Sequence, residues 1–178
     1  MPIERVAVIG AGTMGAGIAQ VCAQAGWQTK LYDAFPEGLE RGMGRIAAFW
    51  EKGIARGKTT PEQRDAWAAN ITAVDDLAVA VGDADLVIEA VPELPDLKHS
   101  IFAQLDKLAP AHAILGTNTS SLSIADIAGA TSNPERVIGM HFFNPVPIMK
   151  LLELVRHERT SQDTIATAQE AGQAMGKT

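Results

Sequence analysis

Short runs of consecutive apolar residues alternate along the chain with longer stretches in which apolar residues recur every three or four positions. The first pattern is typical of strands buried on both faces, and the second of amphipathic helices that cover a sheet. Their alternation predicts a doubly wound α/β fold with a mainly parallel sheet. The expected strands are residues 6–9, 28–32, 71–74, 86–88, 113–115, 136–140 and 151–155, and the clearest helices are 61–69, 95–109, 124–128 and 160–175.

The interval between the second and third strands is long enough for two helices. Apolar residues at helical spacing form one stripe over residues 39–50. Thr60 and Pro61 then form a helix start, with Thr60 as the cap and Gln63 completing a capping box. The sequence therefore predicts a helical hairpin inserted after the second strand.

The inserted hairpin is rich in basic residues. A solvated face is the plainer interpretation of such residues. The functional alternative is that a phosphate-rich substrate tail lies near Lys52, Arg56 and Lys58.

Glycines follow the first predicted strand with the spacing G-x-G-x-x-G, at Gly10, Gly12 and Gly15. Between a strand and a helix, these three glycines allow a tight turn, approach of the backbone to a pyrophosphate, and close packing of the helix. Asp33 ends the second strand about 20 residues later, where a carboxylate accepts hydrogen bonds from an adenosine ribose. It would repel a 2′-phosphate, and Ala34 supplies no arginine, so NAD is favoured over NADP. FAD binds to a similar turn, so it remains an alternative cofactor at this point.

Composition narrows the class of protein. The chain of 178 residues has the length of one domain, or of one domain with part of another, and its single cysteine, Cys22, excludes a disulfide framework. A formal charge of −6 gives no support for nucleic-acid binding. No apolar run has the length of a membrane span, and the first strand begins too early to leave room for a targeting peptide. We therefore expect a cytoplasmic enzyme without nucleic-acid or membrane partners. The chain stops at Thr178 where another strand is due, which we interpret as truncation.

Polar residues gather where the predicted strands end, which is where ligands bind in parallel α/β sheets. His141 follows the strand over 136–140 and can exchange a proton near neutral pH. Glu153 can bring a carboxylate back to this imidazole and stabilise its charged form, although a structural salt bridge is the alternative. Ser120 follows a neighbouring strand, where its hydroxyl can bind a substrate oxygen. A serine nucleophile lacks the G-x-S-x-G pattern, and the histidines lack the spacing of metal ligands, so no metal site is expected.

Five motifs, in order along the chain, resemble the NAD-binding domain of L-3-hydroxyacyl-CoA dehydrogenases: GAGTMGAGIAQ, LYD, VIEAVPE, TNTSSLSI and GMHFFNPVPIMKLLELV. The resemblance extends over essentially the whole chain, and the last motif is the most diagnostic. It implies a Rossmann-type NAD-binding domain over residues 1–178, with NAD as the cofactor.

The resemblance also implies roles for individual residues. His141 is the expected catalytic base, Glu153 its carboxylate partner and Ser120 the contact to the 3-oxygen of the substrate. The residues expected at the cofactor are Gly10, Gly12, Thr13, Met14, Gly15, Asp33, Glu89, Glu93, Lys98 and Asn118. Those expected at the acyl-CoA substrate are Ser120, Asn144 in the HFFNP loop, and Lys52 and Arg56 on the inserted hairpin. The family uses this hairpin to hold CoA, so the last two residues are expected from their place on the hairpin and not from a residue-by-residue match.

The implied reaction is the NAD-dependent oxidation of an (S)-3-hydroxyacyl-CoA to a 3-ketoacyl-CoA, as in the β-oxidation of fatty acids. Members of the family continue into an all-helical second domain that supplies most of a dimer interface and closes over the substrate, and no such domain is present here. We therefore expect a homodimer only with that domain, and a chain that binds NAD but oxidises acyl-CoA weakly or not at all. The alternatives are a dehydrogenase of a small hydroxy or sugar acid, and an NAD-binding module without catalysis.

Overall fold

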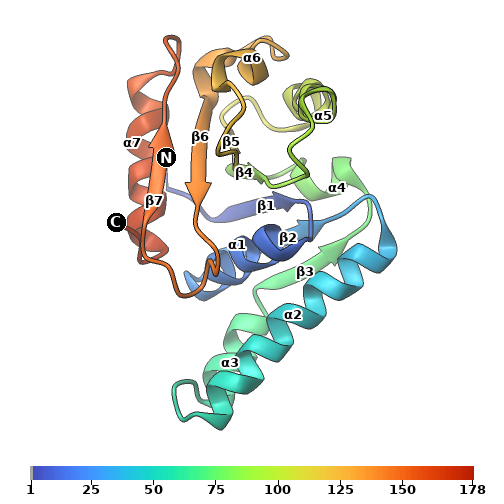
Figure 1. Cartoon of the computed structure of the whole chain (residues 1–178), viewed down its shortest axis with the longest axis vertical. Coiled ribbons are helices and arrows are strands. Elements are labelled where there is room, and N and C mark those ends of the chain that lie inside the picture. Colours follow the sequence, from blue (N-terminus) through green and yellow to red (C-terminus); the bar gives the residue numbers. More distant parts are fainter. Residues whose placement is uncertain (1) are drawn as a thin grey trace.

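Figure 1 shows the computed structural model, which describes residues 2–178. Within these residues seven strands form one sheet in the order β3-β2-β1-β4-β5-β6-β7, with β6 and β7 antiparallel and the other neighbours parallel. This confirms the doubly wound, mainly parallel α/β fold. The strands are β1 (Arg5–Ile9), β2 (Gln28–Tyr32), β3 (Ile71–Val74), β4 (Leu86–Glu89), β5 (Ile114–Thr117), β6 (Val137–Phe142) and β7 (Leu152–Val155).

Helices cover both faces of the sheet, which explains the continuous apolar runs. In β1, Val6 and Val8 enter one core, and Ala7 and Ile9 enter the other. The first core is covered by α1 (Thr13–Gln24), α2 (Pro36–Ala55) and α7 (Gln162–Ala174), and the second by α4 (Leu77–Val81), α5 (Pro95–Leu108) and α6 (Ile124–Ala128). Across residues 2–178, no helix has both the length and the apolar character needed to cross a membrane.

The predicted hairpin after β2 is confirmed as α2 and α3 (Pro61–Ala68), which extend away from the sheet in Figure 1. Thr60 and Gln63 form the expected capping box. The indole rings of Trp50 and Trp67 pack with their centroids 5.8 Å apart, and Trp50 Nε1 donates a hydrogen bond of 2.9 Å to Gln24 Oε1 on α1. The two helices of the hairpin are therefore held together by these rings, and the hairpin is joined to α1 through Trp50.

The last two strands differ from their predicted limits in a way that matters for the site. We expected β6 to end at Met140, with His141 in the following loop, but β6 continues through His141 to Phe142. The reason is the antiparallel ladder with β7, in which His141 pairs with Glu153 and Phe142 with Leu152. His141 is thus held on a strand rather than on a loop.

Candidate functional site: a cavity at the carboxyl ends of the strands

The glycine loop between β1 and α1 has no room for a side chain at two of its glycines, but it has room at the third. Gly10 has a φ of +105°, and a Cβ there would lie 2.7 Å from the carbonyl oxygen of Ala90. A Cβ on Gly15 would lie 1.6 Å from the carbonyl oxygen of Gly10, so α1 begins directly against the turn. A Cβ on Gly12 would meet nothing within 4 Å. The backbone at Gly12 therefore borders open space, which a close-lying ligand requires.

The N-terminus of α1 faces the same space. Gly12 is its N-cap, and within residues 2–178 no side-chain hydrogen bond caps the helix. The first N–H groups and the positive end of the helix dipole are therefore available to an anion. Gly12, Thr13 and Met14 line the cavity described below, whereas Gly15 is buried beneath it.

Asp33 ties the end of β2 to the glycine loop. Its Oδ2 accepts a hydrogen bond of 2.9 Å from the N–H of Ala11, and its Oδ1 accepts one of 2.9 Å from the N–H of Phe35. A carboxylate has about four acceptor positions, so two bonds leave capacity for ribose hydroxyls. The carboxylate also borders the cavity.

A cavity of about 830 Å³ lies along the carboxyl ends of the parallel strands. Near β2 its wall is largely apolar, with Tyr32, Leu97 and Ile101, which suits the flat ring of a nucleobase. At the other end it is lined by Ser120 and His141. An open glycine, an uncapped helix and an apolar end in one cavity fit a dinucleotide that has its pyrophosphate on α1.

His141 and Glu153 form a pair at the far end of this cavity. The imidazole Nδ1 lies 3.2 Å from Glu153 Oε1, and the ring of Phe143 packs on the imidazole with a centroid distance of 4.5 Å. The imidazole is 23% exposed. When Nδ1 donates to the carboxylate, the lone pair of the neutral ring is on Nε2. Nε2 has no hydrogen-bond partner among residues 2–178, so it is available as a proton acceptor.

Three polar side chains accompany His141, two from the loop after β5 and one from the loop after β6. Ser120 is exposed and borders the cavity, as does Asn144 in the loop after β6. Asn118, at the end of β5, accepts a hydrogen bond of 2.9 Å on its Oδ1 from the N–H of Phe142. Because Phe142 is the neighbour of His141 on β6, this bond fixes the backbone beside the imidazole. The structure thus brings together Ser120, Asn118 and Asn144 around His141.

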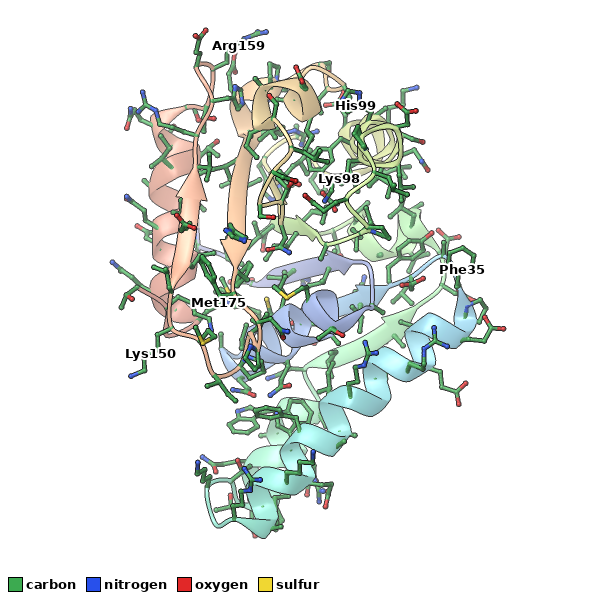
Figure 2. The ribbon with its side chains drawn as sticks, in the orientation of Figure 1. Phe35, Lys98, His99, Lys150, Arg159 and Met175 are labelled. Atoms are coloured by element: carbon green, nitrogen blue, oxygen red, sulfur yellow. The ribbon has the colours of Figure 1, made fainter. Side chains whose placement is uncertain are left out.

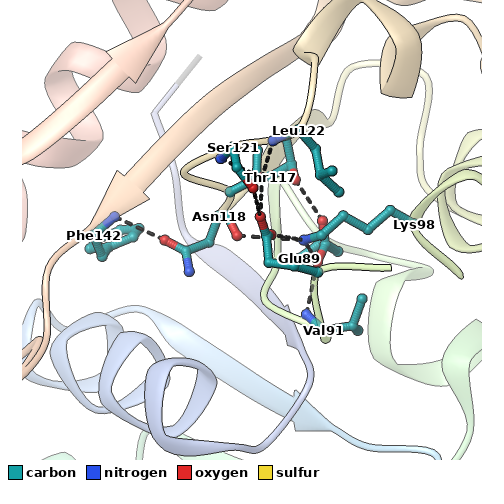
Figure 3. Close-up of polar contacts among 10 residues, drawn as sticks. Glu89, Val91, Lys98, Thr117, Asn118, Ser121, Leu122 and Phe142 are labelled. Carbon is teal, nitrogen blue, oxygen red and sulfur yellow. Dashed lines mark hydrogen bonds and ion pairs between the residues drawn. The ribbon is translucent and has the colours of Figure 1, made fainter. Parts of the chain in front are cut away.

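An ionic cluster with a buried Lys98–Glu89 pair supports this end of the cavity (Figure 3). Lys98 has no exposed side-chain surface, and its Nζ lies 2.6 Å from Glu89 Oε2 and 3.2 Å from Glu93 Oε1. Glu89 also accepts hydrogen bonds from the hydroxyl of Thr117 at 2.6 Å and from the N–H of Val91 at 2.8 Å. Burial raises the pKa of the Glu89 carboxyl, against the opposing effect of the Lys98 ammonium and these hydrogen bonds.

The location of this cluster changes the interpretation of two expected cofactor residues. The side chains of Glu89 and Lys98 are completely buried and do not line the cavity, whereas Glu93 does. Figure 2 shows Lys98 inside the domain, in contrast to Lys150 and Arg159, which extend outward. In this structure Glu89 and Lys98 support the wall, and direct contact of their side chains with NAD stays a prediction.

The structure does not bring Lys52 and Arg56 to the cavity. Both belong to the distal part of the hairpin, at the end of α2 and just after it. Two other arginines of the same helix, Arg41 and Arg45, border a second hollow beside Gly12. Any contact of Lys52 or Arg56 with a substrate therefore involves a part of the ligand far from His141.

Sequence reasoning missed several residues that shape the site. Leu97 and Ile101 lie in a stretch predicted only as a helix, residues 95–109, yet they line the cavity. Phe35 was not singled out, although it lines the cavity next to Asp33. The available signal was position, since these residues follow the carboxyl ends of β2 and β4.

Comparisons with known proteins agree with this geometry. Residues 5–178 match the family model described as 3-hydroxyacyl-CoA dehydrogenase, NAD binding domain. The chain is 43% identical over its whole length to a probable 3-hydroxybutyryl-CoA dehydrogenase of Bacillus subtilis, covering 62% of that protein. It is 45% identical over 98% of its length to the 3-hydroxyadipyl-CoA dehydrogenase of Escherichia coli, covering 37% of it.

A solved structure gives the same result. The crystal structure of the (S)-3-hydroxybutyryl-CoA dehydrogenase PaaH1 from Ralstonia eutropha superposes with a TM-score of 0.95 at 38% identity, covering 98% of this chain and 62% of that one. The chain therefore spans less than two thirds of the length of each of these three proteins.

Proposed function

The chain belongs to the 3-hydroxyacyl-CoA dehydrogenase family, as an NAD-binding domain, and from this membership we propose that it serves the oxidation of an (S)-3-hydroxyacyl-CoA to a 3-ketoacyl-CoA. The observation that carries the proposal is that His141, paired with Glu153, lines the same cavity as the glycine loop. A proton acceptor and a dinucleotide site in one cavity are the two parts that removal of a hydride and a proton from an alcohol requires.

We assign binding of the cofactor to the half of the cavity formed by β1, α1 and β2. The N–H groups at the start of α1 receive the pyrophosphate, and Asp33 receives the adenosine ribose. NAD+ supplies the hydride acceptor when it is bound. Asn118 and Glu93 lie at the end of the cavity next to His141, so the reacting end of the cofactor points toward the imidazole.

We assign the proton transfer to His141. Its Nε2 takes the proton of the substrate hydroxyl as the carbonyl forms, and Nδ1 keeps its hydrogen bond to Glu153. The carboxylate stabilises the positive charge that the ring acquires, and it keeps the ring in the tautomer that can accept a proton. In the reverse reaction the same imidazolium returns the proton to the oxygen.

Contacts to the substrate form the third part of the proposal. Ser120 donates a hydrogen bond to the 3-oxygen beside His141, and Asn144 borders the same space. The CoA portion extends from the cavity toward α2, whose distal cations Lys52 and Arg56 lie far enough along the helix to meet a phosphate at the end of a long ligand.

The oligomeric and cellular parts of the proposal go beyond this chain. We propose that dimerisation and full closure over the substrate require the additional length that the relatives have, and that residues 1–178 alone turn over acyl-CoA weakly. Turnover equal to that of a full-length relative would contradict this. A cytoplasmic location also belongs to the proposal, because a chain with one buried cysteine, Cys22, depends on no disulfide framework and so on no oxidising compartment.

Calorimetric titration of the chain with NADH, followed by acetoacetyl-CoA, tests the proposal. We expect NADH to bind and acetoacetyl-CoA to bind to the NADH complex, while free acetoacetate does not. Binding of free acetoacetate with equal affinity would favour a dehydrogenase of small hydroxy acids. Absence of NADH binding would contradict the proposal as a whole.

A further inference from the structure

Ser120 lies between two residues that are held by one carboxylate oxygen. The hydroxyl of Thr119 donates to Glu93 Oε2 at 2.6 Å, and the hydroxyl of Ser121 donates to the same oxygen at 3.0 Å. The hydroxyl of Ser120 makes no hydrogen bond within residues 2–178, and it borders the cavity. Hydrogen bonds therefore hold the loop on both sides of Ser120, whereas the hydroxyl of Ser120 itself stays available to a ligand.

Glu93 is in turn fixed by the buried ion pair. Its Oε1 lies 3.2 Å from Lys98 Nζ, and Lys98 is held by Glu89 at 2.6 Å, with both of these side chains completely buried. Burial raises the pKa of Glu93, but the bond from Thr119 and the charge of Lys98 outweigh it and leave the pKa below the ordinary value. The ionised Glu93 carboxylate thus links the buried ion pair, which it contacts through Oε1, to the loop, which it contacts through Oε2.

The two hydroxyls are not wall residues of the cavity. Thr119 is only 6% exposed, and neither it nor Ser121 is among the residues that line the cavity. The hydroxyl of Thr119 also accepts a hydrogen bond of 3.1 Å from the N–H of Leu122, which closes a local turn after Ser120. Removal of these hydroxyls can therefore change the loop without removing a group that touches a ligand.

We infer that Glu93 is a positioning residue that, through Thr119 and Ser121, holds the loop in the conformation that presents the Ser120 hydroxyl to the substrate oxygen. This inference rests on the proposed function, because the contact between Ser120 and the 3-oxygen is part of that proposal. A hydrogen-bond donor contributes most when it is held in place before the ligand arrives. The three residues that fix the donor thus contribute to substrate binding although only one of them borders the cavity.

The variants that test the inference remove the bonds to Glu93 and leave Glu93 unchanged. The double variant Thr119→Val/Ser121→Ala removes both hydroxyls, whereas Thr119→Ser keeps the donor as a conservative control. Ser132→Ala is a matched control, because its hydroxyl also donates to a carboxylate, Asp106 Oδ2, at 2.8 Å, but away from the cavity. NADH affinity, acetoacetyl-CoA affinity of the NADH complex, and amide hydrogen exchange over residues 119–122 are measured on the whole chain.

We expect the double variant to bind acetoacetyl-CoA about tenfold more weakly, to keep its NADH affinity within about twofold, and to exchange the amides of residues 120–122 faster. Thr119→Ser and Ser132→Ala are expected to leave both affinities and this exchange unchanged. Addition of Ser120→Ala to the double variant should cause little further loss, because the bonds act through Ser120.

Three results would overturn the inference: unchanged amide exchange in the double variant, an equal loss of NADH affinity, or a Ser120→Ala effect that adds in full to that of the double variant. Failure of the proposed function looks different. If the wild-type chain binds NADH but not acetoacetyl-CoA, the substrate assignment is wrong, while the exchange measurement still decides whether the bonds to Glu93 hold the loop.

Discussion

The two ends of the cavity are built in different ways. The end at β1, α1 and β2 is built around one continuous stretch, residues 5–33, with Leu97 and Ile101 of α5 completing its wall. The main features of this stretch are glycines without a Cβ and free N–H groups at the start of α1. The end at β4 to β7 is formed by side chains from separate strands and loops, among them Ser120, His141 and Glu153. Binding at the first end depends mainly on the shape of the backbone, whereas binding at the second depends on charges and hydrogen bonds of side chains.

This difference predicts how each end responds to substitution. At the glycine loop, an added Cβ either collides with backbone or meets empty space. A Gly→Ala substitution should therefore impair folding at one position and only ligand binding at another. At the other end, polar groups can be removed one at a time. The effect there depends on whether the removed group leaves a buried charge without a partner or only loses a contact to a ligand.

Gly15→Ala is expected to have the largest effect, because it acts on folding. The new Cβ would lie 1.6 Å from the carbonyl oxygen of Gly10, and neither atom can move away unless the backbone moves, because the Cβ is fixed to its Cα and the oxygen belongs to the main chain. We expect a loss of more than about 4 kcal/mol in the free energy of unfolding, measured by urea denaturation followed by circular dichroism. Gly44→Ala is the matched control, since its Cβ meets nothing within 4 Å in α2 and should stabilise the chain by about 0.5–1 kcal/mol. A Gly15→Ala chain with wild-type stability would contradict the geometry of the turn.

Lys98→Met is the corresponding test at the other end. It leaves the Glu89 carboxylate buried without its ammonium partner, so we expect a loss of about 3–5 kcal/mol in the free energy of unfolding at neutral pH. Burial already raises the pKa of Glu89, and loss of the cation raises it further. The folded variant then binds more protons than the unfolded chain. Its loss of unfolding free energy relative to the wild type should therefore become smaller as the pH falls through that raised pKa. Lys98→Met/Glu89→Gln should recover part of the loss, and a deficit independent of pH would show that Glu89 is not its cause.

His141→Ala should leave the fold intact and remove the proton acceptor. In a version of the chain extended by the additional length of a relative, we expect NADH formation from (S)-3-hydroxybutyryl-CoA, measured in a single turnover, to fall by about 10²–10⁴-fold. NADH affinity should stay within about twofold, because the imidazole is bonded to Glu153 and not to the glycine loop. His99→Ala on α5 is the control. A tenfold loss of NADH affinity in His141→Ala would instead identify the histidine as a cofactor residue.

The contrast between the two ends also explains how much could be predicted from the sequence. Strands β2 and β3 and the capping box at Thr60 match their predictions because each depends on local signals, such as apolar runs, caps and turn residues. The glycine loop belongs to the same class, since its geometry is encoded within a few residues. The pairing of His141 with Glu153 could also be predicted, because the two strands that carry them are joined by a short connection.

What could not be predicted depends on contacts between distant segments. The burial of Lys98 follows from its place on the inner side of α5, but the pattern around Asp96, Lys98 and His99 does not indicate which side chain enters the interior. The bonds from Thr119 and Ser121 to Glu93 join residues that are 26 and 28 positions apart. Such contacts are made because the neighbouring strands β4 and β5 bring the loops that follow them together, and no local motif indicates this.

Gly12→Ala is expected to have the smallest effect, and it separates the two roles of the glycine loop. The φ and ψ of Gly12, −72° and −167°, are accessible to alanine, and the new Cβ meets no protein atom within 4 Å. The unfolding free energy should therefore stay within about 0.5 kcal/mol of the wild-type value. The methyl group would occupy the space into which the pyrophosphate fits, so NADH affinity measured by calorimetry should fall about tenfold. Unchanged NADH affinity would mean that the dinucleotide does not approach this backbone, because the substitution alters nothing else at this end of the cavity.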